Sequence, residues 1–234
     1  MAASVSPAAA QVAARRSPNL ADVPRLIIER TNDFRRAEGR RPTGPDAKLG
    51  AAARDFARFM ARADRYGHEA DGKTPAQRAQ EQGYAYCIVL ENIASLYSSE
   101  GFGTQELADR VMLGWKQSPG HRENMLDPDV TDIGVGVAQS EKSRTYYVVQ
   151  LFGRPHSKRI EFRVANASPV AVDYELNGKA YSLPPRSTRT HEECRVARLT
   201  MRLPGERQST TVQPTDGDRY EVERLGPRYR LKKV

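Results

Sequence analysis

The 234-residue sequence contains little cysteine, one tryptophan and no long hydrophobic run. With only Cys87 and Cys194 present, a scaffold held by several disulfides is excluded. The two cysteines can form one bridge between the halves of the chain in an oxidising compartment, or remain two separate buried thiols. No apolar stretch approaches the roughly 20 residues that cross a membrane as a helix, so no transmembrane segment is predicted.

The start of the chain lacks the features of an intact export signal. Residues 1–20 are rich in Ala, Ser and Pro, with Arg15 and Arg16 late in the segment. An early basic region and a strong apolar centre are both missing. We therefore expect residues 1–21 to be a disordered arm or the remnant of a trimmed export signal, outside the fold.

Positive charge is concentrated near the C-terminus. Hydrophobic residues make up 38% and charged residues 28% of the chain, which permits a core and argues against wholesale disorder. Residues 156–234 carry 16 Lys and Arg against 10 Asp and Glu, so +6 of the net charge of +8 lies there. This excess would attract an anionic envelope component or a lipid headgroup, or form an ordinary solvated surface. The charges are scattered, so a nucleic acid is not expected as a partner.

The first two thirds of the chain mix helical and strand patterns. Apolar spacing near 3.6, cap residues and stop residues predict four helices, over residues 22–39, 46–67, 74–83 and 103–117. Two runs of β-forming residues, 133–137 and 146–152, predict an antiparallel pair of strands. This part is therefore assigned to the α+β class.

Two segments between these elements carry polar residues beside apolar ones. Residues 87–90 predict a short buried segment that Glu91 interrupts, and a carboxylate there can be buried only if it is paired. Residues 114–126 hold the only Trp, followed by Ser118-Pro119-Gly120 and His121. We interpret Ser-Pro-Gly as a turn that ends the helix and presents His121 to a cleft, because Pro cannot continue a helix.

After a boundary at residues 153–157 the hydrophobic period changes to two. Alternation over residues 160–164 and 170–176 predicts strands, and Asn177-Gly178 predicts a tight hairpin turn. Further short strand patterns follow, separated by Pro and Gly. Residues 155–234 are therefore predicted to be a small all-β domain, sandwich-like, and no catalytic motif occurs in it.

Short fragments along residues 22–154 form a pattern. They are Asn32 with Arg35, Leu49 with Ala52-Ala53, Gly67-His68, Pro75 with Arg78, Gly83-Tyr84, Glu91-Asn92-Ile93-Ala94, Trp115, Ser118 to Leu126, Gly134-Val135-Gly136 and Tyr147 to Gly153. In this order and spacing they resemble the CAP superfamily (the SCP domain of cysteine-rich secretory, antigen 5 and pathogenesis-related proteins), in its bacterial branch. The resemblance implies an α-β-α sandwich over residues 22–154 and export from the cytoplasm, to the periplasm or the outside.

The resemblance also implies a cavity that holds two His and two Glu. His68, Glu91 and His121 match three of these positions. The fourth position, three residues after the Trp, is Ser118 in this chain. Glu69 and Glu123 are candidates to compensate for the missing acid, and Tyr84 is a candidate to line a cleft for a sugar or lipid.

These residues support two chemical interpretations. His68, His121 and Glu91 can bind zinc or another divalent metal with an open position, which polarises a carbonyl or activates water, with Glu91 as ligand or general base. Alternatively they form a hydrogen-bonded polar cluster that needs no ion. Ser118 is more typical of a turn or cap than of a nucleophile, since it precedes Pro-Gly.

Our functional prediction is a secreted binding or interaction protein, whose His/Glu cavity holds a divalent metal or a small ligand. A zinc-dependent hydrolase that uses the same cavity is one alternative, and a lipid or sterol carrier is another. The basic β domain is predicted to dock to an anionic envelope component.

Overall fold

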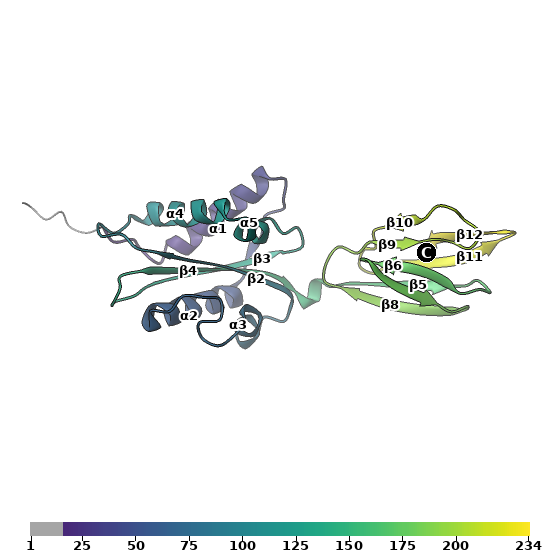
Figure 1. The fold of residues 1–234 in the computed structure, drawn as a ribbon, viewed down its shortest axis with the longest axis horizontal. Helices are drawn as coiled ribbons and strands as arrows, with labels where there is room; N and C mark the ends of the chain where they lie inside the picture. The colour runs from purple at the N-terminus through teal and green to yellow at the C-terminus, as the bar shows by residue number, and fades with distance from the viewer. Residues whose placement is uncertain (1–15) are drawn as a thin grey trace, which may run out of the picture.

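The computed structural model describes residues 16–234, which form two domains lying end to end along the long axis (Figure 1). The first domain holds one four-stranded sheet in the order β1-β3-β4-β2. Its strands are β1 (Gly44–Pro45), β2 (Tyr86–Leu96), β3 (Asp132–Gln139) and β4 (Tyr146–Pro155). Its helices are α1 (Val23–Ala37), α2 (Ala47–Ala63), α3 (Pro75–Glu81), α4 (Thr104–Gln117) and α5 (Pro119–Leu126).

The helices cover both faces of this sheet. Helices α2 and α3 lie on one face, and α1, α4 and α5 lie on the other (Figure 1). Each face has its own core, with Phe56 and Met60 fully buried on the first and Ile27 and Trp115 on the second. The α-β-α sandwich is thus confirmed, and Trp115 belongs to one of its two cores.

Local sequence signals set the helix starts. The Asp46 side chain accepts hydrogen bonds from the backbone N–H groups of Lys48 and Leu49, which caps α2. Thr74 and Gln77 form a reciprocal capping box at the start of α3. Among residues 16–234 no helix has the length and apolar character that crossing a membrane requires.

Two predictions about this domain were wrong in detail. Strand β2 runs through Glu91 without interruption, because the carboxylate is paired inside the domain. Helix α4 ends before Ser118 as predicted, but Pro119 and Gly120 begin helix α5 rather than forming a turn, because a missing N–H costs nothing in the first turn of a helix. The short strand Gly44–Pro45 pairs in parallel with β3.

The start of the described chain is held against the first domain. The backbone N–H of Arg16 donates to Glu100 O, and its guanidinium pairs with Glu106 at 2.7 Å. Leu20 packs against the core. Residues 16–21 thus contact the fold, whereas the rest of the predicted arm, residues 1–15, lies outside the described residues.

The second domain is a β-sandwich. Its two four-stranded sheets have the orders β10-β9-β6-β7 and β12-β11-β5-β8. Asn177 and Gly178 both have positive φ, 50° and 81°, in the β6–β7 turn, which confirms the predicted hairpin. The strands are β5 (Ile160–Asn166), β6 (Val172–Leu176), β7 (Lys179–Leu183), β8 (Ser187–Glu193), β9 (Leu199–Met201), β10 (Thr210–Val212), β11 (Arg219–Leu225) and β12 (Arg228–Lys233).

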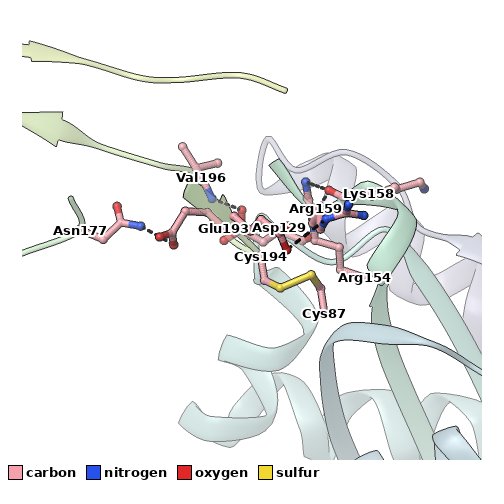
Figure 2. Close-up of a disulfide and its surroundings, with 10 residues drawn as sticks. Cys87, Asp129, Arg154, Lys158, Arg159, Asn177, Glu193, Cys194 and Val196 are labelled. Atoms are coloured by element: carbon pink, nitrogen blue, oxygen red, sulfur yellow. Dashed lines mark hydrogen bonds and ion pairs between the residues drawn. A yellow bond between two sulfur atoms is a disulfide. The ribbon is translucent and has the colours of Figure 1, made fainter. Parts of the chain in front are cut away.

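A disulfide and an ion-pair cluster join the two domains beyond the connecting chain. Cys87 of β2 is bonded to Cys194, which follows β8, so of the two interpretations of the cysteines the structure shows the bridge. The next residue, Arg195, pairs with Asp127 at 2.8 Å and Asp129 at 3.2 Å. Val196 N–H donates to the Asp129 carboxylate (Figure 2). Three consecutive residues of the second domain therefore hold the first.

Close packing of α2 on β3 requires glycine at two positions of the strand. A Cβ added at Gly136 would lie 2.2 Å from Arg54 N, and one at Gly134 would lie 2.2 Å from the Leu49 carbonyl carbon. Both atoms belong to the backbone of α2, which cannot move aside alone. The two glycines therefore let the helix approach the sheet.

We predict that Gly136→Ala lowers the free energy of unfolding by about 3 kcal/mol or more, because the added methyl overlaps a helix backbone. Gly114→Ala is the matched control, since Gly114 lies inside α4 with nothing near its added Cβ. The control should stabilise the protein by about 0.5–1 kcal/mol through helix propensity. Urea unfolding of both variants measures the difference, and equal effects would contradict the packing account.

Candidate functional site

The candidate site is built around a buried carboxylate in the middle of β2. Glu91 is 6% exposed. Its Oε2 accepts from Arg78 Nη2 at 2.8 Å, and its Oε1 lies 2.8 Å from His68 Nδ1. Both oxygens therefore have a partner, and one of the partners is a permanent cation.

Arg78 connects Glu91 to the loop that carries His68. Its Nη1 donates to Asp71 at 2.8 Å and to Lys73 O at 2.7 Å, and its Nη2 also donates to His68 O at 2.8 Å. The guanidinium carbon lies 3.5 Å from the centroid of the Phe56 ring. One buried side chain of α3 thus fixes residues 68–73 against the sheet.

His68 is held on one side only. Its side chain is 53% exposed, and Nδ1 is the ring nitrogen that faces Glu91. No described residue bonds to Nε2. The pair with Glu91 therefore orients the ring and leaves Nε2 available to a ligand.

His121 approaches from the opposite side, in the first turn of α5. Its backbone oxygen accepts from Asn92 Nδ2 at 3.1 Å, and its ring centroid lies 6.5 Å from that of Trp115. Asn124 Nδ2 donates to Glu91 O and to Asn92 Oδ1. Side-chain amides on both elements thus tie α5 to β2 and fix the position of His121 relative to the strand.

The amide network continues into the core of the domain. Asn92 Nδ2 donates to Gln150 Oε1 at 3.0 Å, and Gln150 Nε2 donates to the Thr31 hydroxyl at 2.8 Å. On the far side of α5, buried Arg35 donates to the carbonyls of Met125 and Asp127. Helix α1 therefore also helps to place α5 and its histidine.

Burial and neighbouring charges shift the pKa values of His121 and Glu91. Burial lowers the pKa of His121, and the nearby positive charge of His68 lowers it further. Burial raises the pKa of Glu91, while Arg78 and His68 oppose that rise. At neutral pH His121 is therefore uncharged, and His68 is hydrogen-bonded to a carboxylate that is ion-paired with Arg78.

The predicted site residues fall into two groups. The fold brings His68 into contact with Glu91, and α5 holds His121 beside the same strand through Asn92. The other four lie apart from this set: Ser118 is the residue between α4 and α5, Glu69 and Glu123 are exposed, and the hydroxyl of buried Tyr84 donates to Asp132 at 2.7 Å.

Sequence reasoning missed the roles of three residues of the site. Arg78, Asn92 and Asn124 were noted only as parts of motifs, yet they hold Glu91 and α5 in place. A signal for Arg78 was present, because a carboxylate in an apolar run requires a cation when it is buried. Nothing in the spacing points to the amide contacts, which depend on the tertiary structure.

The donor set does not fit a metal centre with three protein ligands. Over residues 16–234 no group of three or more His, Cys, Asp or Glu side chains is placed to hold a metal ion. A cation at Glu91 would meet the guanidinium of Arg78, which already occupies Oε2. Glu91 is therefore placed to orient His68, and only the two imidazoles remain as candidate ligands.

Comparison with known proteins agrees with this architecture. The model of the family described as "CAP: Cysteine-rich secretory protein family" matches residues 28–152, more than half of the chain. The chain belongs to the CAP family. The CAP domain thus comprises the helices and the sheet that carry the candidate site, while the β-sandwich follows the matched residues.

The relatives of this CAP protein include bacterial ones. YkwD of Bacillus subtilis is 30% identical over 115 residues, which are 49% of this chain and 42% of YkwD, so the match spans less than half of that relative. An extracellular SCP-domain protein of Bacillus anthracis is 24% identical, with a TM-score of 0.48 over 57% of this chain and 41% of that one. An outer surface protein of Borrelia burgdorferi is 21% identical, with a TM-score of 0.49 over 56% and 91%.

We predict that Arg78→Met lowers the free energy of unfolding by about 3–5 kcal/mol, because it leaves the Glu91 charge buried without its guanidinium partner. The pKa of Glu91 should rise further above its ordinary value. A carboxyl with a raised pKa in the folded state loses stability as the pH rises, so the loss should be larger at pH 8 than at pH 5.

Urea unfolding at both pH values measures this effect. Arg25→Ala is the control, because Arg25 forms an exposed pair with Glu29 and its removal should cost no more than about 0.5 kcal/mol. An Arg78→Met loss that is equal at pH 5 and pH 8 would contradict the pairing account.

A second prediction concerns His121. The variant His68→Ala removes the nearby imidazolium, so the pKa of His121 should rise toward its ordinary value. Titration of the ring proton signals by NMR measures the shift. The ring signals of the exposed His156 in the domain linker supply an internal reference. A His121 pKa that stays constant or falls would show that the two rings do not interact.

Proposed function

We propose that this CAP protein is a secreted or periplasmic binding protein, in which the imidazoles of His68 and His121 together hold a divalent metal or a small ligand. The observation that carries the proposal is the pair of 2.8 Å contacts that occupies both oxygens of Glu91. These contacts fix one imidazole and leave its outer nitrogen available.

The same contacts argue against hydrolysis at this site. A general base needs a carboxylate oxygen within reach of the water that it activates. Glu91 has Arg78 on one oxygen and His68 on the other. Ser118 stands at the fourth family position, and Glu69 and Glu123 are exposed. Recognition therefore fits this residue set better than acid–base catalysis.

If a divalent metal is the ligand, His68 Nε2 and the His121 ring would hold it. A carboxylate on the other nitrogen of a ligating histidine is the usual support for such a ring, and Glu91 supplies it here. The bound metal would supply Lewis acidity. The chain itself contributes the orientation of His68 and a neutral His121, whose lowered pKa keeps a lone pair available at pH 7.

Two features support the location and the partner. A disulfide between the domains favours an oxidising compartment outside the cytoplasm. The β-sandwich carries +6 of the net charge, which favours docking to an anionic envelope component. In this proposal the CAP domain binds the ligand and the β-sandwich holds the protein at the envelope.

Calorimetric titration with zinc chloride tests the site. We expect one zinc per chain for the wild type, loss of binding in His68→Ala and in His121→Ala, and unchanged binding in the control His156→Ala. The zinc-loaded protein should not hydrolyse fluorogenic ester or peptide substrates above the buffer rate.

Other results would replace the proposal. Hydrolysis that requires His121 and zinc would establish the hydrolase. An apolar molecule that copurifies with the wild type and both histidine variants, with or without chelator, would establish the lipid carrier. No zinc binding by the wild type would remove the metal from the proposal.

A further inference from the structure

A groove with a volume of about 510 Å³ lies where the two domains meet, apart from the histidine site. One wall is residues 86–90 of β2, with Ala76 of α3. The second domain supplies the other wall, and the Cys87–Cys194 disulfide joins the two walls (Figure 2). The residues of that second wall are Asn177, Glu193, Cys194 and Arg195. We call this the interdomain groove.

The β2 wall of the interdomain groove is the edge of a sheet. Strand β2 pairs only with β4, and Val89 lies opposite Gly153. The Gly153 oxygen accepts from Thr131 N–H, on the other side of β4. In an antiparallel pair both backbone groups of a residue point the same way. The N–H and C=O of Val89 therefore point out of the sheet, and no described residue bonds to them.

Side chains block the edge directly after Val89. Asn124 Nδ2 donates to Glu91 O. Trp115 Nε1 and the Tyr66 hydroxyl both donate to Ile93 O, at 3.0 and 3.1 Å. The outward carbonyls of Glu91 and Ile93 are thus capped by side chains, whereas the outward groups of Val89 face the groove.

We propose that the interdomain groove receives an extended peptide of a partner protein, which adds to β2 as a strand at Val89. The outward N–H and C=O of Val89 can form hydrogen bonds with a C=O and an N–H of a peptide backbone, as in the addition of a strand to a sheet edge. Val89 and Leu90 are partly buried and supply apolar contact.

Of the two charged groups in the groove, only one is paired with an opposite charge. Arg195 pairs with Asp127, whereas Glu193 accepts a hydrogen bond from the neutral amide of Asn177 at 3.1 Å and keeps its negative charge. The groove therefore offers backbone hydrogen bonds, apolar packing and one carboxylate, and it favours an extended segment without acidic residues. The disulfide keeps the second wall in position over the edge.

The probe is a library of linear peptides displayed on phage and selected on the full-length oxidised protein. The recovered peptide, made synthetically, is titrated by fluorescence anisotropy. Val89→Pro removes the outward N–H while an edge strand tolerates proline. It should weaken binding about tenfold, since it leaves a peptide carbonyl without its donor. Val89→Ala keeps the N–H and should change the affinity by less than about twofold.

A second measurement avoids any change in the protein. Two versions of the peptide are made, one methylated on the odd-numbered and one on the even-numbered backbone nitrogens. The version that loses the N–H groups facing β2 should not bind, and the other version should bind like the parent peptide. The variant with Cys87→Ser and Cys194→Ser should also bind the peptide more weakly. The proposal is overturned if no peptide is selected, if Val89→Pro binds as the wild type does, or if both methylated peptides bind like the parent. Full affinity in the cysteine variant would contradict the claim that the second wall, held by the disulfide, contributes to peptide binding.

Discussion

The buried contact between Arg78 and Glu91 is the interaction on which the candidate site depends. Taking a carboxylate out of water is costly unless a partner compensates its charge. Here the compensating guanidinium also binds the backbone of His68 and Lys73 and the carboxylate of Asp71. The same cation therefore allows Glu91 to lie inside the sheet layer and fixes the loop that carries one imidazole. On the other face, Asn92 and Asn124 place α5, so both imidazoles are set by contacts with adjacent residues of one strand.

Strand β2 also relates the site to the second domain. Its first half carries Cys87 and borders the interdomain groove, and its second half carries Glu91 and Asn92. Side chains cap the edge beside the histidine site and leave it open beside the groove. One long edge strand thus borders both the interdomain groove and the histidine site.

Much of the fold could be predicted from the sequence, because its signals are local. Asp46 and Thr74 cap helices, Asn177-Gly178 forms a turn, and the change of period after residue 157 marks the β-sandwich. His68, Glu91 and His121 could be grouped only by the family resemblance, since they lie on three separate elements. The continuity of β2 through Glu91 was missed because it depends on Arg78, a partner 13 residues away that only the folded structure brings into contact. The groove could not be predicted, because its walls come from different domains.

A double-mutant cycle on Arg78→Met and Glu91→Leu tests the central claim most directly. The free energy of unfolding is measured for both single variants, the double variant and the wild type. If the pair organises the site, the double variant loses less stability than the sum of the losses of the two single variants, with a coupling energy of about 2 kcal/mol or more. In the same samples the ring signals of His68 should broaden or shift in every variant. Additive losses, with the His68 signals unchanged, would show that the contact neither stabilises the domain nor positions the imidazole.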